Sequence, residues 1–367
     1  MNGGHEMEEI KNILKKAVSR KILQNEELAA LLDLTEQDER EALFAAARSV
    51  RENQFGNHIF LYGFVYFSTY CRNQCSFCYY RRQNDESIRY RKSLPEILEI
   101  ARALQASGVH LLDLTMGEDP YYLSDGEAGY DRLVSLVRQV KEAVRMPLMI
   151  SPGVVPVKVL LRLQEAGADW YACYQETHTL SLYNRMRVYQ PYDKRWNTKL
   201  FARQHGMLIE EGLLTGIGDT VQDTVHSLGQ MQQLQAEQVR TMTFVPQAGT
   251  PLAAAVPADN RREINLIAVM RLLFPDRLIP ASLDVEGIKG LKARLSAGAN
   301  VVTSIIPPKS GLAGVSQSTL DISDGYRTVQ GVTPILAECG LSAASAAEYQ
   351  EWVRQMKKRS WLEKVSG

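Results

Sequence analysis

The chain has 367 residues, of which 45% are hydrophobic and 23% are charged, as in an ordinary soluble globular protein. Lys plus Arg and Asp plus Glu both number 42, so the net charge gives no reason to expect nucleic acid or an anionic membrane as a partner. The polar start, residues 1–14, lacks the apolar core of a signal peptide, and no run approaches a membrane span. We therefore expect a cytoplasmic protein, whose five cysteines are reduced thiols or metal ligands rather than disulfides.

Residues 1–52 are predicted to form a helical extension packed on the main domain. Apolar residues recur there at helical spacing, for example Leu28, Leu31 and Leu32, and later Leu43, Ala47 and Val50. This extension has no feature that marks a binding module.

From residue 53 to 310 short apolar runs alternate with amphipathic helical patterns, which is typical of repeated βα units around a parallel sheet. The expected strands span residues 59–67, 110–115, 148–150, 170–174, 208–214, 237–243, 278–283 and 301–306. The intervening helical patterns cover 94–104, 133–144, 157–166, both sides of Pro191, 221–231, 264–273 and 288–295. Eight such units predict an α/β fold, a (β/α)8 barrel of the TIM type.

Residues 311–367 are expected to form a C-terminal helical segment packed on the barrel. Within it, residues 326–361 have the pattern of two closing helices, and Gly340 is a stop signal for the first.

Barrel enzymes carry their chemistry on the loops that follow the strands, so polar residues should gather at the strand ends. The chain fits this expectation at 113–119, 151–153, 175–177, 216–219, 240–243, 282–286 and 303–304.

The run from Cys71 through Cys75 to Cys78, C-x-x-x-C-x-x-C, directly follows the first expected strand. A cubane iron-sulfur cluster normally takes four thiolates, so three closely spaced cysteines leave one iron open. Structural zinc is the alternative, but it needs four closed ligands, and the nearest histidines, His58 and His110, lie in strand-like segments. Accidental free cysteines are a third reading, although three within eight positions exhaust most of the supply.

This spacing, with Phe77 directly before the third cysteine, resembles the radical S-adenosylmethionine (SAM) superfamily. The resemblance implies a [4Fe-4S] cluster held by Cys71, Cys75 and Cys78, and SAM bound at the open iron. Gly117-Glu118-Asp119 partly matches the G-G-E-like stretch that supports the SAM amino group, with Met116 in place of the first glycine. An acidic surface turn is the alternative there.

Glu176 in Tyr174-Gln175-Glu176-Thr177, together with Arg195 downstream, resembles a pair in the subgroup of biotin synthase and the hydrogenase maturase. The resemblance assigns both residues to SAM, whose carboxylate suits a bidentate arginine. Arg185 and Arg187 are nearby alternatives, and a surface salt bridge is the plain reading of any one of them.

The predicted substrate site comprises Asp113 in the second strand, Arg240 in the sixth, Ser282 and Asp284 at the end of the seventh, and Ser151 and Ser304 after the third and eighth. Two carboxylates and one guanidinium at a barrel mouth match a zwitterion with an additional ammonium group, because buried charges need partners. Arg240 and Ser282 would hold the α-carboxylate, Asp113 and Asp284 would hold ammonium groups, and Ser151 could contact either ligand. The alternative is a structural ion pair between Arg240 and Asp284.

Several runs resemble the methylornithine synthase family: FGNHIFLYGFVYFSTYCRNQCSFCYY, DLTMGEDPYY, MISPG, YQET, MTFVPQAGTPL, FPDRLIPASLDVEGI and AGANVVTSIIPP. The resemblance implies a mutase that converts L-lysine into (3R)-3-methyl-D-ornithine, the first step of pyrrolysine biosynthesis. An adenosyl radical would take hydrogen from C4, the bond between the α and β carbons would break, and a glycyl radical and an aminobutene would recombine. Biotin synthase is disfavoured, because Cys173 and Cys339 do not supply the ligands of its second cluster.

The reaction requires an external one-electron donor, such as a flavodoxin or ferredoxin, and an anaerobic setting, because oxygen damages an open-iron cluster. We expect a monomer. Two other hypotheses stay open: another radical SAM enzyme acting on a different amino acid, and a non-catalytic iron-sulfur or zinc protein.

Overall fold

The computed structural model describes residues 3–316 and 326–366, with side chains from 7 to 316 and from 326 to 360. Its centre is a barrel of eight parallel strands in the order β6-β5-β4-β3-β2-β1-β8-β7. The strands are β1 (His58–Ser68), β2 (Leu111–Met116), β3 (Leu148–Ser151), β4 (Trp170–Ala172), β5 (Leu208–Thr215), β6 (Gln238–Thr243), β7 (Pro280–Ser282) and β8 (Val301–Ile305). The backbone N–H of Val239 donates to the carbonyl of Leu278 at 3.0 Å, which joins β6 to the approach of β7. The predicted (β/α)8 architecture is therefore confirmed.

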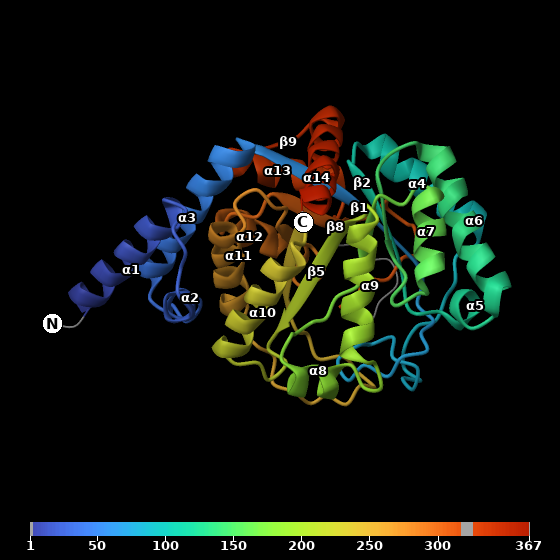
Figure 1. Cartoon of the computed structure of the whole chain (residues 1–367), viewed down its shortest axis with the longest axis horizontal. Helices are drawn as coiled ribbons and strands as arrows, with labels where there is room; N and C mark the ends of the chain where they lie inside the picture. Colours follow the sequence, from blue (N-terminus) through green and yellow to red (C-terminus); the bar gives the residue numbers. More distant parts are fainter. Residues whose placement is uncertain (1–2, 317–325, 367) are drawn as a thin grey trace.

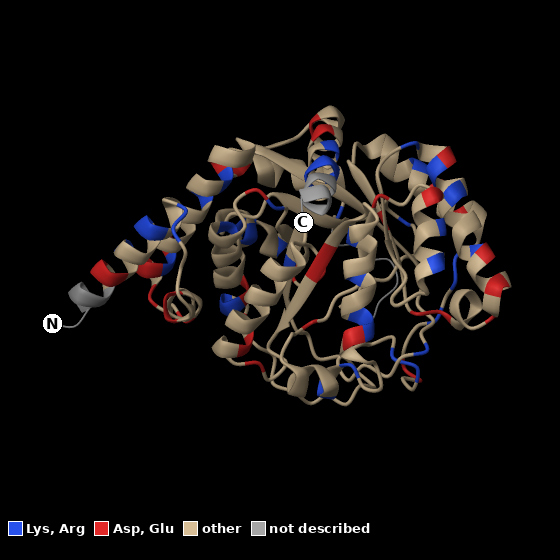
Figure 2. Cartoon of the chain, in the orientation of Figure 1, with Lys and Arg blue, Asp and Glu red and all other residues tan. Residues whose placement is uncertain are grey.

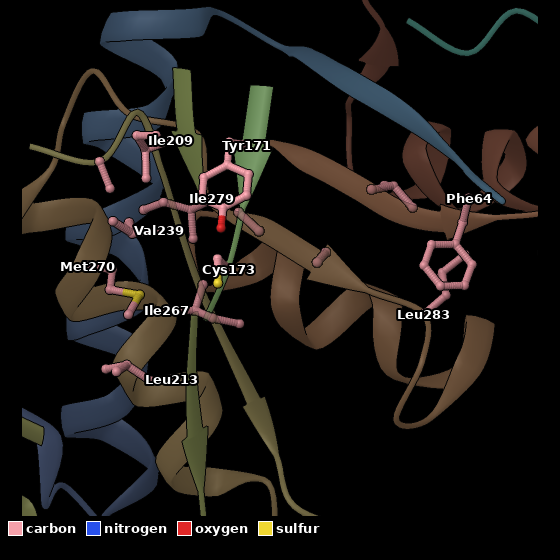
Figure 3. Packing of buried hydrophobic residues seen from close by; sticks show 14 of the residues in the cluster. Phe64, Tyr171, Cys173, Ile209, Leu213, Val239, Ile267, Met270, Ile279 and Leu283 are labelled. Atoms are coloured by element: carbon pink, nitrogen blue, oxygen red, sulfur yellow. The ribbon is translucent and has the colours of Figure 1, made fainter. Parts of the chain in front are cut away.

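The helices around the barrel follow the predicted patterns, with one short helix that was not predicted, α5. They are α4 (Leu94–Ser107), α5 (Pro120–Leu123), α6 (Gly126–Val144), α7 (Val157–Glu165), α8 (Leu180–Met186), α9 (Tyr192–Gln204), α10 (Val221–Leu234), α11 (Arg261–Leu273), the 3-10 turn η1 (Gly287–Gly290) and α12 (Leu291–Ser296). A reciprocal cap between Ser93 and Glu96 begins α4, and another between Thr220 and Asp223 begins α10. Their apolar faces cover the outer face of the strands. Figure 3 shows Ile267 of α11 near Val239 and Cys173 in this outer layer.

The last helix of the described chain closes the amino end of the barrel. After α13 (Val329–Glu338) the chain turns at Gly340, in the left-handed region at φ 68°, adds the short strand β9 (Ser342–Ala343) beside β1, and enters α14 (Ala346–Ser366). Trp352 of α14 stacks on Trp170 of β4 with ring centres 5.8 Å apart. The hydroxyl groups of Tyr349 and Tyr62 share a hydrogen bond of 2.7 Å. Figure 1 shows α14 across one end of the barrel, so ligands must enter from the other.

The N-terminal helices α1 (Gly3–Val18), α2 (Asn25–Leu32) and α3 (Gln37–Phe55) project to one side and pack on α11. Arg40 Nε donates to Asn265 Oδ1 at 3.0 Å, and Asn265 Nδ2 donates to the Leu34 carbonyl at 2.9 Å. Helix α3 ends at Phe55, three residues beyond the predicted boundary at residue 52, and Gly56, at φ 59°, follows as its C-cap. The division into residues 1–52, 53–310 and 311–367 stays a prediction, and residues 317–325 of its last segment lie outside the described part.

In the described part of the chain, no helix has both the length and the apolar character that a membrane crossing requires.

Candidate active site

The three cysteines of the motif line one cavity of about 230 Å³ at the carboxyl end of the strands. The same cavity is lined by Phe77, Glu118, Ser151, Glu176 and Arg195. The loop after β1 therefore meets the loops after β2, β3 and β4, as the sequence predicts.

Three cysteine thiols that line one cavity are the ligand set of a [4Fe-4S] cluster with one open iron. Within the described residues, no group of three or more His, Cys, Asp or Glu side chains is arranged to hold one metal ion. Burial, and then the neighbouring Cys75, raises the pKa of Cys71 to about 12 and also raises that of Cys78, so binding of iron must displace protons. Gly117 allows the β2 loop to lie against the cysteine loop, because a Cβ there would be 2.3 Å from the Tyr70 carbonyl oxygen. These residues fit a [4Fe-4S] cluster at this place.

Glu118 lies in a set of hydrogen-bond donors from two loops and helix α9. Its carboxylate accepts from Arg72 Nε at 3.1 Å, from Arg195 Nη2 at 3.2 Å and from the Val154 backbone at 3.2 Å. Burial raises the pKa of Glu118, but the Arg195 and Arg72 guanidinium groups outweigh it and hold the pKa below its usual range. Gly153, at φ 75°, leaves room for this carboxylate, since a Cβ would be 2.3 Å from Glu118 Oε1. Glu118 is thus a buried anion rather than part of a surface turn.

Glu176 adopts a left-handed backbone at φ 68°, which is uncommon for a residue other than glycine and clusters at functional sites. Its carboxylate pairs with Arg187 at 2.5 Å, whereas Arg195 binds Glu118. Gln190 links both arginines, because its Oε1 accepts from Arg195 Nη2 at 2.7 Å and from Arg187 Nη1 at 3.4 Å. Its Nε2 donates to Cys75 Sγ at 3.1 Å. Arg187, an alternative in the sequence analysis, therefore belongs to the site as much as Arg195.

Cys173 also lines this cavity, although its sequence context appeared ordinary. Its sulfur accepts a hydrogen bond from Arg195 Nη1 at 2.8 Å. Cys173 directly follows β4, whereas the three motif cysteines follow β1, and its sulfur is bound by Arg195 of α9. It therefore does not complete a four-thiol site in the structure.

Inside the barrel, Arg240 pairs with Glu210 and not with Asp284. Arg240 Nε lies 2.7 Å from Glu210 Oε1, and Glu210 is fully buried in β5. Figure 2 marks β5 by a red segment in its middle, which comprises Glu210 and Glu211. Burial lowers the pKa of Arg240, but Glu210 outweighs it and the net direction is upward. The guanidinium therefore stays charged.

Asp113 faces the same interior, since the strand register pairs it with Met149 and pairs Thr115 with Ser151. Its carboxylate accepts from Thr115 Oγ1 at 2.8 Å and from Ser151 Oγ at 3.2 Å. Burial, and then the Glu210 carboxylate, raises the pKa of Asp113 to about 7. An ammonium group that binds next to Asp113 would therefore stabilise its ionised carboxylate.

Asp284 forms a separate buried pair with Arg327, at 3.1 Å between Nη1 and Oδ1. Ser304, at φ 67°, donates its hydroxyl to Asp284 Oδ2 at 2.6 Å, and the Asp284 backbone N–H donates to Ser282 Oγ at 3.3 Å. The alternative of an Arg240–Asp284 ion pair is therefore wrong. A substrate ammonium group would have to share the Asp284 carboxylate with Arg327, so the prediction that Asp284 holds an ammonium group stays a prediction.

The structure thus brings together all the predicted cluster and SAM residues, with Ser151, around the cavity. The other predicted substrate residues are not part of the cavity lining: Asp113, Arg240, Ser282, Asp284 and Ser304. The predicted site residues did not include Glu210, Gln190, Arg327 or the side chain of Tyr174. Only Glu210 had a clear signal, because two adjacent glutamates interrupt an apolar strand.

Comparison with known proteins agrees with this geometry. Residues 65–230 match the model of the radical SAM superfamily. The cofactors of the chain are accordingly a [4Fe-4S] cluster and SAM.

Two relatives are named 3-methylornithine synthase. The protein of Methanosarcina acetivorans is 47% identical over 90% of this chain and 93% of its own length, and that of Methanosarcina barkeri is 45% identical over 94% and 97%. A crystal structure of methylornithine synthase (PylB) superposes with a TM-score of 0.88 and 45% identity, over 93% of this chain and 99% of that one. The chain therefore belongs to the 3-methylornithine synthase family of radical SAM enzymes.

Proposed function

We propose that this protein is the isomerase that converts L-lysine into (3R)-3-methyl-D-ornithine, the first step of pyrrolysine biosynthesis. The observation that carries the proposal is the pair of charged groups inside the barrel, Arg240 and Asp113, below a cavity lined by three cysteines. Arg240 suits the α-carboxylate of an amino acid, and Asp113 suits an ammonium group.

The charges of the interior support lysine in particular. When Asp113 is ionised, Asp113 and Glu210 carry two negative charges against the one positive charge of Arg240, and Arg327 balances Asp284. Free lysine has two ammonium groups and one carboxylate, so it brings the one positive charge that this set lacks. A neutral amino acid would leave a buried carboxylate unpaired, which is costly.

In this proposal Cys71, Cys75 and Cys78 hold the cluster, and Phe77, Glu118, Glu176 and Arg195 surround SAM. When bound, these cofactors supply the 5′-deoxyadenosyl radical that takes hydrogen from an unactivated carbon. Arg187 and Arg195 offer the guanidinium groups that suit the SAM carboxylate, and Glu118 and Glu176 offer acceptors for its ammonium and ribose hydroxyl groups.

The remaining task of the protein is to hold the two substrate fragments between bond breakage and recombination. Misplacement of reacting groups by about 1 Å can cost on the order of a hundredfold in rate. Arg240 and Ser282 would retain the glycine fragment by its carboxylate. Asp113 and Asp284 would retain ammonium groups, with Ser151 and Ser304 supporting the two carboxylates. The packing of α14 against the amino end of the barrel supports this retention, because it covers that end.

We further propose a monomeric, cytoplasmic enzyme in an anaerobic setting, reduced by a small one-electron carrier such as a flavodoxin or ferredoxin. The arginines of the cysteine loop support an acidic carrier. Arg72, Arg81 and Arg82 are all at least partly exposed near Cys71 and Cys78.

The proposal is tested by anaerobic reconstitution of the protein with iron, sulfide, reductant, SAM and isotope-labelled L-lysine. We expect a labelled product of unchanged mass that co-elutes with authentic methylornithine, and none with norleucine, which lacks the side-chain ammonium group. Cleavage of SAM without any isomer of lysine would indicate a different radical SAM enzyme. A reconstituted cluster with four protein ligands that does not bind SAM would indicate a non-catalytic metal protein.

A further inference from the structure

Glu210 is a buried carboxylate in the barrel interior, whose charge enters the proposed balance with lysine but which holds no substrate group in that proposal. It lies in the middle of β5, is fully buried, and shares the inner face with Ala172 and Gln238, its register partners on the neighbouring strands. We infer that Glu210 is a positioning residue of the substrate site, which fixes the Arg240 guanidinium by its Nε and leaves both terminal nitrogens for the substrate carboxylate. The inference rests on the proposed function.

Three hydrogen bonds hold the Glu210 carboxylate in one place. Its Oε1 accepts from Arg240 Nε at 2.7 Å and from Gln238 Nε2 at 2.6 Å, and its Oε2 accepts from the Tyr174 hydroxyl at 2.7 Å. The Tyr174 ring reaches this position only because Gly212 has no side chain, since a Cβ there would be 2.9 Å from the ring. Glu210 is therefore a rigid anchor, held by groups from β6 and from the end of β4.

The anchor occupies only one edge of the Arg240 guanidinium. Within the described part of the chain, neither Nη1 nor Nη2 of Arg240 forms a hydrogen bond. Two further groups of the barrel strands, Gln238 Oε1 and Thr303 Oγ1, also lack a hydrogen-bond partner there, although both residues are buried. Buried polar atoms are rarely left unpaired, so this part of the barrel is built to receive a polar ligand. A carboxylate binds the open edge of a guanidinium through two parallel hydrogen bonds.

Glu210 also sets the charge that Asp113 experiences. The charged and titratable groups that face Asp113 are Glu210 on β5, Arg240 on β6 and Tyr174 beyond β4, with Thr115 and Ser151 as hydrogen-bond donors. The Glu210 carboxylate disfavours ionisation of Asp113, and Arg240 favours it. Removal of the Glu210 charge should therefore make Asp113 ionise at lower pH, which a merely structural residue would not do.

The test compares three variants by the pH dependence of kcat/KM for lysine, because this ratio reports the ionisation of the free enzyme. In Glu210→Gln we expect the KM for lysine to rise about tenfold, since a neutral acceptor holds a guanidinium roughly half as strongly, and the acid limb to move to lower pH. In Glu210→Asp the negative charge stays, but the shorter side chain moves the carboxylate away from Arg240. The KM for lysine should therefore rise, while the acid limb of the kcat/KM profile stays at the wild-type pH. Glu211→Gln is the matched control: Glu211 is equally buried on the same strand but binds Lys199 outside the barrel interior, and its acid limb should not move.

A Glu210→Gln enzyme with the wild-type KM, or with an unmoved acid limb, would overturn the inference. The proposed function would still stand if the wild-type enzyme converted lysine into methylornithine. If Glu210→Gln does not fold, Glu210→Asp decides, and an unchanged KM in that variant overturns the inference. Absence of methylornithine from the wild-type reaction would refute the proposed function itself. SAM cleavage without lysine, together with cluster absorbance, confirms in each case that the cofactor half of the site is intact.

Discussion

Replacement of Arg240 by Lys separates the two ideas about this residue, a fork that binds a carboxylate and a simple counter-charge for Glu210. Lys keeps the positive charge but offers a single ammonium centre, so it cannot hold Glu210 and also present two parallel donors to the substrate. Arg240 is only 6% exposed, and solvent therefore does not replace the lost contacts.

The size of the effect follows from the hydrogen bonds lost. Arg240 can donate Nε to Glu210, as the structure shows at 2.7 Å, and both Nη atoms to the substrate. The substitution removes at least one charge-assisted hydrogen bond, of about 1.5 to 3 kcal/mol. At roughly 1.4 kcal/mol per factor of ten, kcat/KM for lysine should fall by about tenfold to 150-fold.

The assay measures methylornithine formation against lysine concentration, with SAM cleavage in the absence of lysine as the internal check. Arg271→Lys provides a matched control, because Arg271 is also buried and forked, but its partners are backbone carbonyls and Asn300 on the outer face of the barrel. We expect that control to lose stability without a change in the KM for lysine. If Arg240→Lys kept wild-type kcat/KM, Arg240 would not bind the substrate carboxylate.

Four further predictions concern Asp113, Asp284 and the cluster. Wild-type kcat/KM should rise with pH through about 7, as Asp113 ionises, and Asp113→Asn should lower kcat/KM and abolish that limb; a retained limb assigns it elsewhere. Because the folded pKa of Asp113 exceeds 3.8, its contribution to stability is lost as pH rises from about 4 to 7, which denaturant titrations of the same variant should show as a flatter dependence. Asp284→Asn should cost about 3 to 5 kcal/mol of stability by leaving Arg327 unpaired, and Asp284→Asn with Arg327→Met should recover part of it; an unchanged KM for lysine in the stable double variant would make Asp284 purely structural. Cys78→Ser should lose the visible absorbance of the cluster, and a coloured variant would contradict its role as a ligand.

Most strands were predictable because they are short apolar runs that a parallel sheet buries on both faces, whereas β6 and β7 contain polar residues. β1 shows this most clearly, since ten of its eleven residues, all but His58, are buried. The two elements missed, α5 and β9, have four and two residues, and such lengths carry no periodicity. Gly340 was a reliable stop because its left-handed φ is a property that glycine alone supplies cheaply.

The partners of the charged residues were harder to predict than the residues themselves. A strand places a side chain on the inner or the outer face, so Asp113 and Arg240 could be assigned to the interior from alternation alone. Their partners depend on the stagger between strands: Arg240 is the register partner of Gly212, and Glu210 lies two residues before Gly212 on the same face of β5. No feature of the sequence fixes that stagger.

Glu210 and Glu211 show what the sequence nevertheless contained. Adjacent residues of a strand point to opposite faces, so two neighbouring buried glutamates require two separate cationic partners, one inside the barrel and one outside. The structure supplies Arg240 on the inner side and Lys199 of α9 on the outer side. Since Arg240 was already assigned to the interior, the inner glutamate could have been weighed beside Asp284 as its partner, although the choice between the two depends on the stagger of the strands. A charged doublet in an apolar strand therefore predicts a polar layer in the barrel, and it is this layer that distinguishes a site for a diamino acid from a site for a hydrocarbon.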